Sequence, residues 1–193
     1  MANQKSNLDR RVAVKSILTN RGDALVVTGL GSSSYDVGTM DHPNTYYLWG
    51  GMGGAAMIGL GLAIAQPKRR VLVITGDGEM LMGLGSLATI GAEKIRNLSI
   101  IVLDNELYSE TGMQPTHTSR GVNLAGIASA AAQSGSPGSQ RSPNRFAIAH
   151  GVRCSLDPRG SPQIARTCCS NWQETWPSIV KWPELCGRGA VSL

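Results

Sequence analysis

The chain has 193 residues, of which 41% are hydrophobic and 16% charged, so it is long enough for one domain with a buried core and is not a disordered polyelectrolyte. No apolar run has the length of a membrane-spanning helix, which argues against a membrane partner. The net charge is +5, but residues 1–132 carry 11 basic and 10 acidic side chains against 7 and 3 in residues 133–193, so the nearly neutral body predicts no nucleic-acid partner.

The N-terminal residues MANQKSNLDRR lack the apolar stretch of a signal peptide, and we expect a cytoplasmic protein. From Leu8 to about Ala132, helical periodicity alternates with short β-branched runs. In chain order the pattern predicts a helix from near Leu8 to Asn20, a strand over Ala24–Thr28, a loop over Gly29–Ser34, a strand over Thr45–Trp49, a helix over Gly53–Ala65, a strand over Val71–Thr75, a helix over Met80–Ile95, a strand over Leu98–Leu103 and a helix from near Val122.

These strand segments are continuous apolar runs, which is typical of strands buried on both faces of a parallel sheet. We therefore predict an α/β fold, a parallel sheet flanked by helices, in a domain covering residues 1–132.

Residues 133–193 differ in character from this domain. They begin with QSGSPGSQRSPNR and show no sustained period apart from a strand candidate over Phe146–Val152. One interpretation is an irregular tail rich in Ser, Pro, Arg and Cys; the other is a non-native continuation, such as the product of a reading-frame change. All four cysteines lie in this tail at spacings that fit no zinc or redox motif, so we expect unpaired thiols.

Polar residues follow two successive predicted strands. Gly76-Asp77-Gly78-Glu79 follows VLVIT, and Asp104-Asn105 follows the next strand. The carboxyl ends of parallel strands meet at the edge where open α/β sheets bind ligands. Carboxylate and amide oxygens suit Mg²⁺, and the helix that starts after Gly78 points its N–H groups at the same place, which favours a diphosphate.

This pattern resembles the diphosphate-binding domain of the thiamine-diphosphate-dependent decarboxylases. Their signature is GDG followed, at the spacing seen here, by Asn-Asn, and the chain departs from it only at Asp104. The stretch from Gly76 to Thr118 is most similar to the β subunit of sulfopyruvate decarboxylase and to the matching part of phosphonopyruvate decarboxylase. The resemblance covers about residues 8–130 and implies the thiamine-diphosphate-binding fold.

The resemblance also implies roles for single residues near the two motifs. The side chains of Asp77 and Asn105 and the backbone carbonyl of Leu107 would be the protein ligands of Mg²⁺. The cofactor's diphosphate would lie against the turn formed by Gly76, Gly78 and Glu79, with the last two giving backbone N–H groups.

A second loop, Trp49-Gly50-Gly51-Met52, matches the part of the family that holds thiamine diphosphate bent. Met52 would be the wedge between the two rings of the cofactor, and the carbonyl of Gly50 would hold the aminopyrimidine. Thr28 and Gly29 resemble a further cofactor-contact loop.

The resemblance implies a carboxy-lyase that acts on a small anionic 2-keto acid. In the family the activating Glu belongs to a separate pyrimidine-binding domain, and no region of this chain resembles that domain. We therefore expect a hetero-oligomer with a pyrimidine-binding α subunit and no activity from this chain alone. A sulfonate or phosphonate on the substrate would find His117 or Arg120 as contacts, unless both are solvated loop residues.

Two alternatives stay open. The chain could be a catalytically silent subunit of the same fold. It could also be a dinucleotide-binding protein, because Gly51, Gly53 and Ala56 match G-x-G-x-x-A and Asp77 follows at a suitable distance; this interpretation leaves Asp104-Asn105 unexplained.

Overall fold

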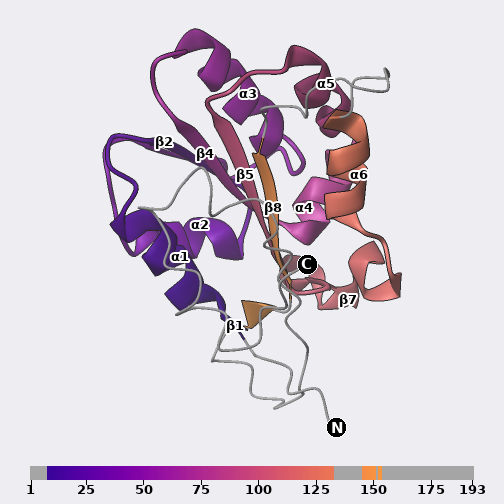
Figure 1. Cartoon of the computed structure of the whole chain (residues 1–193). Coiled ribbons are helices and arrows are strands. Elements are labelled where there is room, and N and C mark those ends of the chain that lie inside the picture. The colour runs from indigo at the N-terminus through magenta and orange to yellow at the C-terminus, as the bar shows by residue number, and fades with distance from the viewer. Residues whose placement is uncertain (1–7, 133–144, 151, 154–193) are drawn as a thin grey trace, which may run out of the picture.

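The fold is built around a five-stranded parallel sheet (Figure 1). The computed structural model describes residues 8–132, 145–150 and 152–153. The sheet has the order β3-β2-β4-β5-β8, and its strands are β2 (Leu25–Thr28), β3 (Thr45–Tyr47), β4 (Val71–Gly76), β5 (Leu98–Asp104) and β8 (Arg145–His150). All four neighbouring pairs are parallel, which confirms the predicted fold class.

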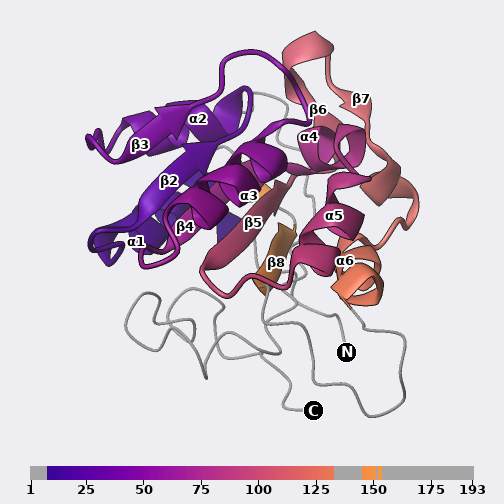
Figure 2. The ribbon, with the colours of Figure 1, turned by 90° about the horizontal axis from the view of Figure 1, so that it is seen from above.

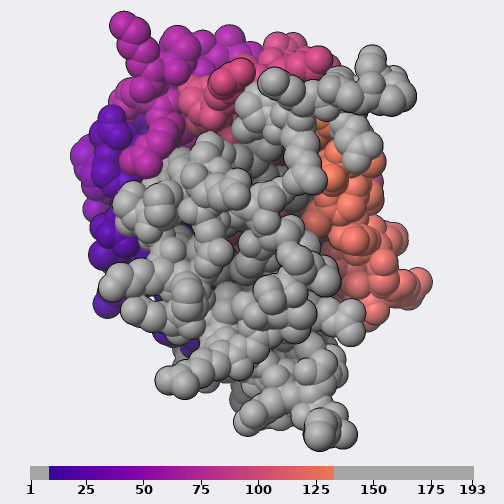
Figure 3. All heavy atoms as spheres, in the orientation of Figure 1, coloured from indigo at the N-terminus to yellow at the C-terminus, as the bar shows by residue number. Residues whose placement is uncertain are grey.

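Helices cover both faces of this sheet. α1 (Arg10–Thr19) and α2 (Ser32–Gly38) pack on one face, and α3 (Ala55–Ala65), α5 (Ser86–Glu93) and α6 (Leu124–Ala132) lie side by side on the other (Figure 2). The side chains of α1 and α6 accordingly lie at opposite sides of the space-filling view (Figure 3). Successive residues of one strand serve different cores, because Val26 packs toward α1 and Val27 toward α3.

The path of the chain through the sheet reverses once. From β2 it goes outward to β3 at the edge, and then returns to β4 on the other side of β2. In open α/β sheets such a reversal leaves a crevice at the carboxyl ends of the two central strands, and ligands bind there. The crevice between the ends of β2 and β4 is therefore where a site is expected.

The structure corrects two predicted elements. The predicted loop over Gly29–Ser34 becomes helix α2 from Ser32 onward. The predicted helix over Met80–Ile95 starts earlier and consists of two helices, α4 (Asp77–Met82) and α5. The chain breaks between them because Gly83 packs directly on Gly53, where a Cβ would overlap the carbonyl oxygen of Gly53.

Small elements complete the described chain. β6 (Leu107–Tyr108) and β7 (Gln114–Pro115) form an antiparallel hairpin after β5, with one 3₁₀ turn at its tip and another after it, over His117–Arg120. β1 (Leu8–Asp9) pairs in parallel with β9 (Val152–Arg153). None of the helices in the described ranges has the length and apolar character needed to cross a membrane.

Part of the predicted tail joins the sheet. β8 pairs along β5 from Ser99 to Asp104, so the strand candidate at Phe146–Val152 is confirmed in position, with β9 following it. The domain boundary at residue 132 and the foreign-tail hypothesis stay predictions. The four cysteines and the remainder of residues 133–193 lie outside the described residues.

The glycines of α3 give a matched test of this packing. A Cβ on Gly59 would overlap Val73 of β4, whereas one on Gly61 would meet no atom within 4 Å. We expect Gly59→Ala to lower the free energy of unfolding by about 1–3 kcal/mol. Gly61→Ala should raise it by up to about 1 kcal/mol through helix propensity. Urea unfolding of the full chain measures both, and equal effects would contradict the packing of α3 on β4.

Candidate functional site

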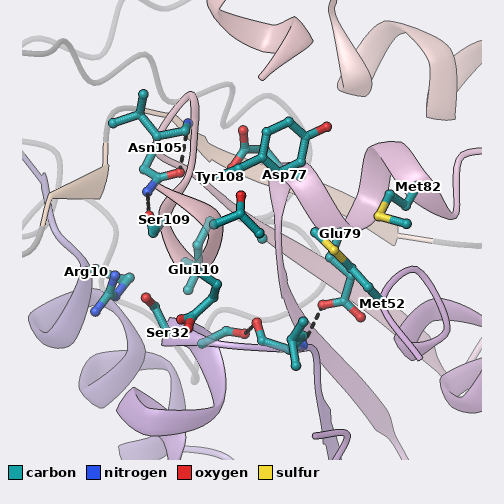
Figure 4. A pocket seen from close by; sticks show the side chains of 17 residues that line it. Arg10, Ser32, Met52, Asp77, Glu79, Met82, Asn105, Tyr108, Ser109 and Glu110 are labelled. Atoms are coloured by element: carbon teal, nitrogen blue, oxygen red, sulfur yellow. Dashed lines mark hydrogen bonds between the residues drawn. The ribbon is translucent and has the colours of Figure 1, made fainter. Parts of the chain in front are cut away.

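A pocket of about 280 Å³ lies at the carboxyl ends of the central strands (Figure 4). Its walls come from the connections that follow β2, β3, β4 and β5, and from the start of α1. Most of the residues predicted from the sequence line it: Met52, Gly76, Asp77, Gly78, Glu79, Asn105 and Leu107. Residues predicted from separate parts of the sequence thus meet in one cavity.

Four other predicted residues, Thr28, Gly29, Gly50 and Gly51, do not line the cavity. Thr28 is buried, with its hydroxyl bonded to that of Ser34, and Gly29 packs against the side chain of Glu79. Gly50 and Gly51 are exposed and precede Met52, and Gly51 adopts a φ of +67°. These four residues therefore support the pocket wall or approach it, without lining the cavity.

Two carboxylates lie side by side where β4 and β5 end, and of the two only Asp77 lines the pocket. The parallel register pairs Gly76 with Leu103, so the next residues, Asp77 and Asp104, are neighbours. Both are almost fully buried, at 2% and 0% exposure. Burial, and then the charge of Asp104, raise the pKa of Asp77 to about 6. This end of the sheet is therefore electrostatically suited to a cation.

The hydroxyl groups of two threonines form hydrogen bonds with these carboxylates. The hydroxyl of Thr116 donates to Oδ2 of Asp77 at 2.6 Å. The hydroxyl of Thr118 lies 3.2 Å from the same oxygen and 2.9 Å from Oδ1 of Asp104. The sequence interpretation missed both threonines, and the only signal for them was their spacing of two residues.

Asn105 is fixed by bonds within its own loop. Its Oδ1 accepts the N–H of Leu107 at 3.1 Å, and its Nδ2 donates to Oγ of Ser109 at 2.9 Å. Glu106, between the two predicted metal-binding residues, has a φ of +64°, a conformation that costs energy in a non-glycine residue and occurs often at functional sites. The backbone is thus turned sharply where Leu107 would present its carbonyl.

These residues fit a hard divalent cation. The described part of the chain has no cluster of three His, Cys, Asp or Glu side chains, so a cation here would need amide and carbonyl oxygens beside the single carboxylate of Asp77. Asn105 and Leu107 line the same pocket and can supply them. Such an all-oxygen set, with few protein ligands, is what Mg²⁺ binds together with phosphate oxygens.

The side chain of Glu79 has a role that the sequence interpretation did not foresee. It is 3% exposed, and Oε2 accepts bonds from the N–H of Leu30 at 2.8 Å and the hydroxyl of Thr75 at 2.7 Å. A Cβ on Gly29 would overlap the same oxygen, which is why glycine is needed there. Burial raises the pKa of Glu79, against the effect of these hydrogen bonds. The carboxylate therefore joins the loop after β2 to the turn after β4.

The charged lining differs from the prediction. His117 and Arg120 are exposed and do not line the pocket. Arg10, at the start of α1, does line it and forms an ion pair with the buried Asp36. No local signal in the sequence could have indicated Arg10, because only the fold brings α1 to this end of the sheet.

Comparison with known proteins agrees with this geometry. The family model described as thiamine pyrophosphate enzyme, C-terminal TPP binding domain, matches residues 29–166. Over 117 residues the chain is 41% identical to sulfopyruvate decarboxylase subunit beta of Methanocaldococcus jannaschii, which covers 60% of this chain and 62% of that protein. It therefore spans somewhat less than two thirds of that relative.

Two further proteins are similar. Phosphonopyruvate decarboxylase of Streptomyces viridochromogenes is 47% identical over 109 residues, which are 56% of this chain and 27% of that protein. The thiamine diphosphate-dependent 4-hydroxybenzoylformate decarboxylase of Rhodococcus jostii RHA1 superposes with a TM-score of 0.54 at 20% identity, over 67% of this chain and 27% of that chain. The latter similarity shows the fold.

The raised pKa of Asp77 predicts how pH changes the stability of the metal-free chain. In the fold this pKa moves from 3.8 to about 6, so the folded chain binds the proton more tightly than the unfolded chain. The resulting stabilisation is fully present below about pH 4, decreases as pH rises through about 6, and amounts to about 3 kcal/mol.

Urea unfolding in EDTA between pH 4 and 7 should therefore show the wild type losing stability relative to Asp77→Asn. Parallel pH curves for the two proteins would contradict this electrostatic description.

Proposed function

The chain belongs to the thiamine pyrophosphate enzymes, through their C-terminal TPP-binding domain, and from this membership we propose that it is the diphosphate- and Mg²⁺-binding subunit of a 2-keto acid decarboxylase. The proposed substrate is a small keto acid with a second anionic group, as in sulfopyruvate or phosphonopyruvate. The one observation that carries the proposal is that Met52, Asp77 and Asn105, from three separate connections, line a single pocket.

Each of these residues has a proposed task. Asp77, Asn105 and the carbonyl of Leu107 would hold the metal ion, and the N–H groups of Gly78 and Glu79 would contact the diphosphate. When bound, thiamine diphosphate supplies the carbon nucleophile and the electron sink for loss of carbon dioxide. The protein's part is to anchor the cofactor and to fix its conformation.

The second loop would set that conformation. Met52 lies in the pocket wall close to Gly78, because a Cβ on Gly78 would come 3.6 Å from the terminal methyl carbon of Met52. A flexible thioether at this place suits a wedge between two rings. Gly50 and Gly51, just before Met52, leave the backbone open for approach by the aminopyrimidine.

We propose that a second chain completes the site. The activating Glu expected from the family would come from a pyrimidine-binding α subunit. One observation supports this: the relatives named as β subunits imply a companion subunit for those proteins.

Of the two alternatives, a dinucleotide-binding protein is disfavoured by the structure. The loop with Gly51 and Gly53 follows β3, a three-residue strand at the edge of the sheet, whereas a dinucleotide fingerprint follows a central strand. A silent subunit of the same fold is separated from an active one by the assay described below.

The first test removes the charged metal ligand. Asp77→Ala should weaken Mg²⁺-dependent binding of thiamine diphosphate at least about 10-fold, because a carboxylate is lost beside a dication. Calorimetric titration of the full chain with the cofactor, with and without Mg²⁺, measures this. Wild-type binding that is insensitive to Mg²⁺, or unchanged binding by the variant, would refute the assignment.

Met52→Ala should have a different effect. The anchoring contacts of the diphosphate end survive, but the bent cofactor is less favoured, so turnover should fall more than cofactor affinity. The assay uses the chain assembled with its co-purified α subunit, with sulfopyruvate and phosphonopyruvate as substrates. A larger loss of affinity than of turnover would show that Met52 only packs, and a wild-type complex that binds cofactor but turns over neither keto acid would favour a silent subunit.

A further inference from the structure

The β6–β7 hairpin connects the candidate metal ligands to the two buried threonines. It begins at Leu107, two residues after Asn105, and its second strand ends at Pro115, next to Thr116. The N–H of Thr116 donates to the carbonyl of Glu106 at 2.9 Å, which closes the hairpin at its base. The segment after Asn105, of which residues 107–111 also line the pocket, is thereby brought back to Asp77.

The threonines then turn inward while their neighbours turn outward. Thr116 and Thr118 are 1% and 8% exposed, whereas His117 between them is exposed. Both hydroxyls point at the carboxylate of Asp77, and they lie 2.9 Å from each other.

The threonine hydroxyls have few protons to donate to the acceptor oxygens around them. Each threonine hydroxyl has one, and the 2.6 Å contact assigns that of Thr116 to Oδ2 of Asp77. The hydroxyl of Thr118 is then the donor to Oδ1 of Asp104 at 2.9 Å, or is shared with Asp77 at 3.2 Å. Both buried carboxylates are held in one orientation by hydroxyl groups that carry no charge.

We propose that Thr116 and Thr118 are positioning residues that hold the carboxylate of Asp77 in the orientation that binds the divalent cation, an inference that rests on the proposed function. Oδ2 of Asp77 accepts the hydroxyl of Thr116, which is not among the lining residues, and Asp77 itself lines the pocket. Partners that orient a ligand in this way typically contribute 10–100-fold to metal affinity.

Asp104 acquires a structural role in the same arrangement. Its Oδ1 accepts the N–H of Glu106 at 3.0 Å as well as the hydroxyl of Thr118. Asp104, the residue at which the chain departs from the Asn-Asn pattern, thus bonds both the residue before the hairpin and the threonine after it. Asp104 would therefore orient the site without binding the metal itself.

The test measures metal affinity, with Mn²⁺ as the probe and thiamine diphosphate present. The free ion is quantified by electron paramagnetic resonance on the full chain assembled with its co-purified α subunit. Thr116→Val and Thr118→Val keep the shape and remove the hydroxyl, and each should weaken Mn²⁺ binding about 10-fold. Thr116→Ser and Thr118→Ser keep the hydroxyl and should stay within about 3-fold of the wild type.

Thr19→Val is the matched control. The hydroxyl of Thr19 donates to the carbonyl of Lys15 on the exposed side of α1 at 2.7 Å, far in the fold from Asp77, and its loss should leave Mn²⁺ affinity unchanged. Circular dichroism of the metal-free proteins shows whether each variant is folded.

The outcomes separate this inference from the proposed function. Wild-type affinity in folded valine variants, with binding lost in Asp77→Ala, would overturn the positioning role alone. Equal losses in the serine and valine variants would also overturn it, because packing and not the hydroxyl would then matter. Absence of Mn²⁺ binding by the wild-type chain assembled with its α subunit would overturn the proposed function and this inference with it.

Discussion

The site depends on two carboxylates that the sheet forces together. The parallel register of β4 and β5 makes Asp77 and Asp104 neighbours, both buried. Two adjacent negative charges away from water are unfavourable unless hydrogen bonds or a cation compensate them. The hydroxyls of Thr116 and Thr118 and the N–H of Glu106 supply such hydrogen bonds. Repulsion between the carboxylates of Asp77 and Asp104 is unfavourable in the metal-free chain, and the same pair of charges favours binding of a dication.

A second set of contacts keeps the loops of the pocket close to one another. Glu79 joins the loop after β2 to the turn after β4, and this is possible only because Gly29 has no side chain. Gly53 and Gly83 touch in the same way, which brings the loop of Met52 against the end of α4. The chain contains 24 glycines in 193 residues. Some of them are needed because segments distant in sequence approach each other too closely for a side chain to fit between them.

Much of this arrangement could be predicted from the sequence, and the missing parts have physical causes. Buried strands such as β4 and β5 are recognisable because nearly all of their residues are apolar, and the polar residues that follow them locate the pocket. Helix α2 was missed because the residues SSSYDVG have weak helix propensity and begin with three serines. The roles of Thr116, Glu79 and Arg10 come from contacts across 39 or more residues or from helix placement, which no local pattern contains. The exposed position of His117 shows the converse, that a chemically attractive side chain can point away from the cavity.

The pairing of β5 with β8 has a consequence for the order in which the chain folds during synthesis. All seven residues of β5 are buried in the finished structure, yet the strand that covers its outer side lies about 40 residues further along, at Arg145–His150. While the nascent chain is shorter than this, β5 is the edge of a four-stranded sheet, with open backbone groups and apolar side chains. Ribosomes that stall or terminate in this interval would release chains that are prone to associate edge to edge. Protection of the β5 edge against association therefore depends on β8, a strand that lies outside the segment with the proposed metal-binding residues.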